Sequence, residues 1–146
     1  VRDRAAEAGV VLALEHTGAL RLDLSFVTTL RDGVDAAGAL DVGVCVEVNS
    51  CFAERNLEET LHDADVLLRH VQLSDFVIGS HCTPDRAVPG DGDIPLGSIL
   101  RQLDTAGYQG AFELELVGPR IEAEGYEHAI TRATTYLDEL LSTSVS

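Results

Sequence analysis

The sequence contains no lysine, so its ten basic residues are all arginine, and they face 25 aspartates and glutamates for a formal net charge of -15 at pH 7. A field of this sign repels polyanions, so we expect no nucleic acid and no anionic membrane surface among the partners. Cations and neutral, hydroxyl-rich molecules are easier to accommodate. A second interpretation of the acidic surface is that it serves only solubility.

Cysteine is scarce, and no long apolar run is present. Cys45, Cys51 and Cys82 form no CxxC pair and no group with histidine at zinc-finger spacing, so we expect reduced thiols and no disulfide framework. No stretch approaches the roughly 20 apolar residues of a membrane span, and no basic-then-apolar signal peptide opens the sequence. These features favour a cytoplasmic location.

The chain has 146 residues, of which 45% are hydrophobic, so it is large enough to bury a core of its own. We expect a single domain over residues 1–146. The opening residues, RDRAAEAG, resemble the last turns of a helix whose beginning is missing. This pattern favours the second half of a longer protein.

Four short segments rich in β-formers are bounded by Gly, Asp or Asn, and they predict strands over residues 9–16, 41–49, 69–75 and 110–116. Helical patterns follow them over residues 24–37, 57–68, 95–106 and 124–141. Asn56 and Asp93 are the expected N-caps of the second and third helices, and Gly107 ends the third. Strand followed by helix, four times, indicates βα units and a parallel sheet.

Alternate residues of the four strands define two faces. One face is large and apolar and should be covered by helices; it carries Leu12, Leu14, Val42, Val44, Val46, Val71, Leu73, Phe112, Leu114 and Leu116. The other changes from small to polar toward the strand ends, which suits the interior and mouth of a (β/α)8 TIM barrel better than an open sheet. A complete barrel needs eight such units. The four present indicate either half of a longer barrel or a half-barrel that pairs with a second copy.

Four oxygen donors meet at the predicted carboxyl ends of the strands: Glu15, Glu47, Gln72 and Glu115. Such a set suits a hard divalent cation, Mg²⁺ or Mn²⁺. Clustered carboxylates also raise each other's pKa, and a glutamate tuned in this way can take a proton from a carbon next to a carbonyl while a second one returns it. The alternative is that the strand ends carry ordinary solvated acids.

Other polar residues near these strand ends have simpler explanations. His70 and Glu113 lie one layer deeper on the polar face, where we expect His70 to fill the interior and Glu113 to contact the other half of the barrel. Asp75 follows the third strand and either caps the next turn, which we favour, or orients a ligand. His16 follows Glu15 and should point to the opposite face.

The segments ALEH, VGVCVEVN, HVQLSD and, above all, PGDGDIPLGSILRQLDTAGYQGAFELEL resemble the second half of the xylose isomerase-like TIM barrels, the sugar phosphate isomerase/epimerase family. The resemblance covers essentially the whole chain, as strands five to eight of that barrel. It implies a divalent metal held by Glu on the fifth strand, Asp on the sixth, His on the seventh and Glu on the eighth.

By this resemblance, Glu15 and Glu115 are metal ligands and also the catalytic acid/base pair. Glu47 stands where the family has its Asp, and Gln72 stands where the family has its metal-binding His. Gln72 can offer a carbonyl oxygen but no imidazole nitrogen, which shifts selectivity toward hard cations or removes the metal altogether.

Two further positions match substrate-binding residues of the family. Ser50 falls where many members have a histidine, and Arg86 matches an arginine that contacts sugar hydroxyls. With few cations near the site, an unphosphorylated sugar, polyol or keto acid is the expected substrate.

The resemblance implies a metal-assisted sugar isomerase or epimerase. The departures at Glu47, Ser50 and Gln72 support an alternative, a catalytically degenerate barrel that binds a ligand or a partner protein. A dehydratase or aldolase would use the same residues and stays open. A nuclease acting on abasic sites is disfavoured, because it needs several histidines at the strand ends and a less acidic surface.

Overall fold

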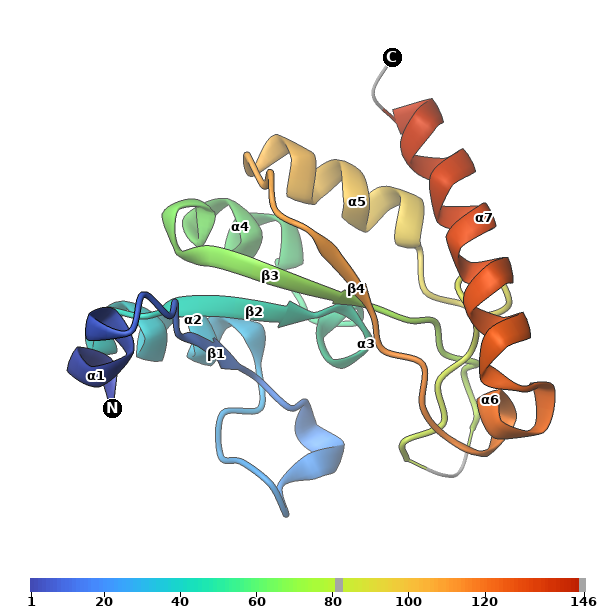
Figure 1. Cartoon of the computed structure of the whole chain (residues 1–146), viewed down its shortest axis with the longest axis horizontal. Coiled ribbons are helices and arrows are strands. Elements are labelled where there is room, and N and C mark those ends of the chain that lie inside the picture. Colours follow the sequence, from blue (N-terminus) through green and yellow to red (C-terminus); the bar gives the residue numbers. More distant parts are fainter. Residues whose placement is uncertain (81–82, 145–146) are drawn as a thin grey trace.

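The computed structural model describes residues 1–80 and 83–144, with side chains up to Ser142; His81 and the predicted free thiol of Cys82 lie outside this part. Four parallel strands form one sheet in the order β1-β2-β3-β4 (Figure 1). Their bounds are Ala13–Glu15, Gly43–Glu47, Leu68–Leu73 and Phe112–Leu114. The predicted strands are confirmed but shorter, because only these residues have a paired neighbour on the sheet.

Helices follow each strand and pack on one face of the sheet. The helices are α1 (Arg2–Glu7), α2 (Leu30–Leu40), α3 (Val48–Cys51), α4 (Leu57–Asp63), α5 (Leu96–Thr105), α6 (Pro119–Glu124) and α7 (Tyr126–Ser144), with 3-10 turns at Ala19–Arg21 and Asp65–Leu67. Neighbouring helices contact each other in the order α2, α4, α5 and α7 (Figure 1). Within the described part of the chain, no helix is long and apolar enough to cross a membrane.

Three predicted helices differ most clearly in their bounds. The first helix begins at Leu30 instead of Leu24, because the Thr29 side chain accepts a hydrogen bond from Asp32 N and caps the helix there. The second ends at Asp63, and Leu68 already belongs to β3. The last begins at Tyr126 instead of Glu124, because Gly125, with a φ of 94°, cannot continue a helix and separates α7 from α6.

The predicted cap at Asp93 is wrong. Its carboxylate accepts a hydrogen bond from Ile78 N at 2.8 Å, and α5 begins after Pro95 without a side-chain cap. Asn56 does stand at the N-cap of α4, but its side chain makes no capping hydrogen bond. Gly107 follows the end of α5 as predicted.

The apolar face of the sheet carries the core, as predicted. Side chains of β2 and β3 on this face are fully buried and pack against α2, α4 and α5; they are Val44, Val46, Val71 and Leu73. His16 is also fully buried on this side, where Gly33 of α2 approaches its Cβ. The helices thus cover one face and leave the polar face, with its strand ends, available for a site (Figure 1).

Candidate active site at the carboxyl ends of the strands

The centre of the site is an arginine between two glutamates. Nη2 of Arg86 lies 3.1 Å from Oε2 of Glu47 and 2.9 Å from Oε2 of Glu115. The Arg86 side chain is 14% exposed and that of Glu47 only 1%. Three predicted site residues from three different segments therefore meet in one largely buried ionic cluster.

The residues directly after β2 donate hydrogen bonds to the Glu47 carboxylate. Glu47 is the N-cap of the one-turn helix α3, and its Oε1 accepts a hydrogen bond from Asn49 N at 3.0 Å. The Ser50 hydroxyl donates to Oε2 at 2.7 Å. Burial raises the pKa of Glu47, while Arg86 and these hydrogen bonds act in the opposite direction. Ser50 was predicted to bind substrate; in this structure its hydroxyl donates a hydrogen bond to Glu47.

Glu15 approaches the same cluster from the end of β1. Partial burial raises the pKa of its carboxyl, the negative charge of Glu115 raises it further, and Arg86 partly opposes both. The two predicted acid/base residues lie within electrostatic reach of each other.

Gln72 belongs to a second cluster, on the same face. His70 Nε2 lies 2.6 Å from Glu113 Oε2, and the Gln72 amide donates to the same oxygen at 3.3 Å. The Cys45 thiol donates to Gln72 Oε1 at 3.6 Å. The hydrogen bonds from His70 and Gln72 lower the pKa of Glu113.

This second cluster bears on two predictions. Glu113 is hydrogen-bonded to His70 and Gln72 of β3, and its expected contact with the other half of the barrel stays a prediction. Gln72 is paired in register with Glu113 and Glu47, so it does not face Glu115 as a single four-residue set would require. The physical reason is the stagger of parallel strands, which separates residues that look equivalent along each strand.

Asp75 organises the loop that supplies Arg86, a role stronger than the predicted turn cap. It is 1% exposed, and its two oxygens accept four backbone hydrogen bonds of 2.8 to 3.0 Å, from the N–H groups of Phe76, Gly90, Gly92 and Ile94. A Cβ at Gly92 would clash with this carboxylate. The sequence signal was an aspartate directly after a strand, followed by a glycine-rich loop.

The backbone on either side of Arg86 is fixed as well. Asp75 and Ala87 exchange two backbone hydrogen bonds, 2.9 and 2.8 Å long, and Arg86 N donates to Val117 O at 3.0 Å. The segment therefore spans the ends of β3 and β4. From this position the Arg86 side chain reaches Glu47 at the end of β2 and Glu115 directly after β4.

Two cavities open beside the cluster, with volumes of about 190 and 540 Å³. Both are lined by Ser50 and Arg86, the two residues predicted to bind substrate, together with Leu20, Asn49 and Thr83. Glu115 lines the smaller one. A small ligand in either cavity would lie next to the ionic cluster.

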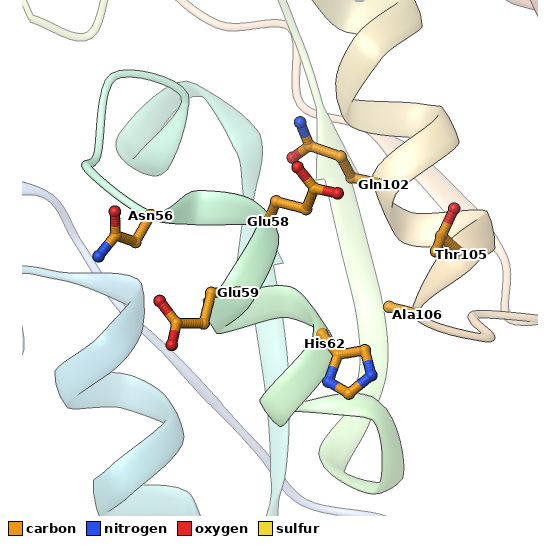
Figure 2. A pocket seen from close by; sticks show the side chains of 7 residues that line it. All are labelled: Asn56, Glu58, Glu59, His62, Gln102, Thr105 and Ala106. Carbon is orange, nitrogen blue, oxygen red and sulfur yellow. The ribbon is translucent and has the colours of Figure 1, made fainter.

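Another pocket, of about 430 Å³, lies between α4 and α5 on the helical side of the molecule (Figure 2). Its side chains include Glu58, Glu59, His62 and Gln102, and Glu58 and Gln102 point toward one another. None of the predicted site residues lines it. Because its polar groups stand on the far side of the sheet from the strand-end cluster, we assign it no part in the site.

The fold and the strand-end site together match a known family. The family model described as the xylose isomerase-like TIM barrel matches residues 1–136. The chain belongs to this family. The predicted family and the predicted partial TIM barrel are thereby confirmed, and a comparison with curated protein sequences gives no match.

Solved structures support the same assignment. The zinc-bound IolI protein is 26% identical with a TM-score of 0.82, over 98% of this chain and 53% of that chain. The 3-keto-D-glucoside 4-epimerase YcjR from E. coli is 25% identical with a TM-score of 0.64, over 90% and 48%. The D-psicose 3-epimerase from Clostridium cellulolyticum H10, at 22% identity and a TM-score of 0.70 over 96% and 52%, shows the fold. This chain spans about half the length of each.

Proposed function

We propose that this chain forms strands five to eight of a barrel that isomerises or epimerises a small hydroxy-carbonyl compound, such as an unphosphorylated sugar. The observation that carries the proposal is the contact of Arg86 with both Glu47 and Glu115 beside two cavities that Arg86 lines. Membership of the xylose isomerase-like family, with sugar epimerases among the similar structures, supports the same chemistry.

In the proposed reaction, Glu15 and Glu115 are the catalytic pair. One carboxylate removes a proton from the carbon next to the carbonyl, and the other carboxyl group delivers a proton to the neighbouring carbon or to the opposite face. A raised pKa brings a glutamate closer to the working pH, and burial together with the charge of Glu115 raises the pKa of Glu15. Ser50 and Arg86, which line both cavities, would orient the substrate oxygens.

A divalent cation is the proposed cofactor, with Mg²⁺ or Mn²⁺ preferred. Its ligands would be Glu15, Glu47, Gln72 and Glu115, an all-oxygen set that fits hard cations. When bound, the cation would polarise the substrate carbonyl. Among the described residues, no three His, Cys, Asp or Glu side chains are grouped for a metal ion, and Arg86 pairs with two of the proposed ligands, so the observed arrangement does not itself fit the cation.

The open edges of the sheet imply a structural partner. Val11 beside β1 is 69% exposed and Phe26 in the following loop is 92% exposed. Edges and apolar residues of this kind are covered in stable barrels. We propose that four further βα units, or a second copy of this chain, cover them.

The proposal is tested on the intact protein with a panel of unphosphorylated ketoses and aldoses. We expect turnover that falls by about a thousandfold or more in Glu115→Gln, because the proton-transfer group is lost. We also expect Mn²⁺ to raise the melting temperature. Unchanged turnover in the variant, with no response to Mn²⁺, would refute the assignment.

The alternative function is a degenerate barrel that binds a ligand or a partner protein without turnover. The observation that favours it is the pairing of Gln72 with Glu113 and Cys45, away from the glutamates around Arg86. Gln72→His distinguishes the two functions. Metal binding and turnover that appear only in this variant would support the degenerate barrel, whereas activity in the natural sequence would rule it out.

A further inference from the structure

The larger of the two cavities beside the cluster, of about 540 Å³, is lined by two neighbouring residues that each keep one polar atom unpaired. Oδ1 of Asp85 is an acceptor and Nε of Arg86 is a donor; both atoms are buried and have no hydrogen-bond partner among the described residues. Buried polar atoms without partners cost free energy. A hydroxyl group both donates and accepts, so it is the ligand group that can satisfy both atoms.

The rest of the Asp85 side chain is already fixed by the protein. Its Oδ2 lies 3.5 Å from Nη2 of Arg120, and the side chain is only 9% exposed. The loop after β4 packs directly on this segment, because a Cβ at Gly118 would lie 2.7 Å from Pro84 O and 2.9 Å from Asp85 Cα. Asp85 is therefore held in place with one oxygen paired and the other left over.

Phe52 and Phe76 supply an apolar part of the same cavity wall. Their ring centroids are 6.2 Å apart, and both residues pack against the buried core, which fixes their position. Ligand cavities of roughly 300 to 1,000 Å³ typically combine apolar surface of this kind with a few placed polar groups. A carbon chain that carries hydroxyl groups presents both kinds of surface.

We propose that the larger cavity is a subsite for the hydroxyl-bearing carbon chain of the substrate, and that Asp85 selects a neutral hydroxyl over an anionic group there. The position of the reacting end rests on the proposed function: Glu115 lines the smaller cavity, whereas no described glutamate lines the larger one. Ser50 and Arg86 line both cavities, so one ligand can extend past them from the first to the second.

The far end of such a ligand meets Asp85. A hydroxyl there donates to Oδ1 of Asp85 and accepts from Nε of Arg86, the donor that the contacts of Nη2 with Glu47 and Glu115 leave unused. A phosphate or carboxylate cannot donate this hydrogen bond when ionised, and its charge is repelled by the Asp85 carboxylate. The subsite thus distinguishes ligands by the group at the end away from the carbonyl.

The test is a ligand-observed NMR titration of the intact protein with D-fructose and D-fructose 6-phosphate, which differ only at the end away from the carbonyl. We expect the natural protein to bind D-fructose at millimolar concentrations and the phosphate ester about tenfold more weakly. Asp85→Ala removes the acceptor, and we expect it to bind D-fructose about tenfold more weakly than the natural protein. Asp63→Ala, which removes an aspartate from an exposed pair with Arg31, is the matched control and should stay within about twofold.

Asp85→Asn separates recognition from folding. Asparagine keeps an oxygen acceptor and removes the negative charge, so we expect D-fructose to bind within about threefold of its natural affinity and the phosphate ester to bind about tenfold more tightly than before. A purely structural role for Asp85 would change both affinities together. An unchanged affinity in Asp85→Ala, an unaltered preference in Asp85→Asn, or no binding of D-fructose by the natural protein would overturn the inference.

These outcomes are distinguishable from failure of the proposed function, because binding is measured apart from turnover. Turnover of a ketose by a protein whose affinities do not depend on Asp85 would leave the isomerase standing and refute the subsite. Binding that depends on Asp85, without turnover of any sugar in the panel, would support the subsite and contradict the isomerase.

Discussion

Each of the two polar clusters on the open face of the sheet contains a glutamate from β4 or the residue after it, Glu115 in one and Glu113 in the other, yet their surroundings differ. Around Arg86, the Glu47 side chain is 1% exposed and that of Glu115 is 29% exposed. Around His70, the Glu113 side chain is 51% exposed. Glu113 and Glu115 are separated by one residue.

The difference comes from what covers each cluster. The loop anchored by Asp75 brings Arg86 over the strand ends, so the first cluster is enclosed by protein and its charges depend on one another. The second cluster consists of side chains from the strands alone, and no loop within the described residues covers it, so it is partly exposed to solvent. The first cluster should therefore dominate both stability and chemistry.

The largest effect is expected when the enclosed cluster loses its cation. Arg86→Met leaves Glu47 buried without a counter-charge, and we expect it to lower the free energy of unfolding by about 3 to 5 kcal/mol in urea titrations with EDTA. Adding Glu47→Gln should recover part of the loss. Arg31→Met, in an exposed pair, is the control and should cost about 1 kcal/mol or less.

A slightly smaller effect is expected from the anchor of the loop. Asp75→Ala leaves four backbone N–H groups without their acceptor, and we expect a loss of about 3 kcal/mol in the same urea titration. Digestion with a protease should then cleave near residues 86–93 faster than in the natural protein. An unchanged cleavage rate would mean that the loop is held without Asp75.

Beneath the first strand lies a group that responds to pH. Burial lowers the pKa of His16 to about 4 from its ordinary value of 6.5. Between these values the unfolded chain binds a proton that the folded chain does not, so stability should fall by about 2 to 3 kcal/mol as the pH drops from 6.5 to 4. His16→Leu should flatten this part of the profile in thermal melts; an identical slope would place the titration elsewhere.

The smallest effect is expected in the exposed cluster. The side chains of His70 and Glu113 are 36% and 51% exposed, so their pair contributes little after screening by solvent. We expect His70→Ala to cost about 1 kcal/mol or less in the urea titration. A cost close to that of Arg86→Met would show that the two clusters are equally important and would remove the contrast between them.

Much of the fold follows from local patterns. The alternation of Val44 and Val46 in β2, and of Val71 and Leu73 in β3, correctly predicted the face that the helices cover. Helix bounds were less accurate, because the cap at Thr29 and the break at Gly125 depend on single residues within longer helical patterns.

The grouping of the polar residues was harder to predict than their types. Arg86 contacts Glu47 and Glu115, whereas Gln72 donates a hydrogen bond to Glu113, and their roles stay predictions. A period-2 pattern places residues along one strand, whereas the stagger between strands decides which of them face each other.

The βα units, their apolar face and the oxygen donors at the strand ends can be predicted from local pattern, because side-chain alternation is a property of the strand alone. The position of Arg86 between Glu47 and Glu115, and the loop that Asp75 holds in place, depend on the folded chain. Those contacts join residues 12 to 39 positions apart, and no local pattern specifies them.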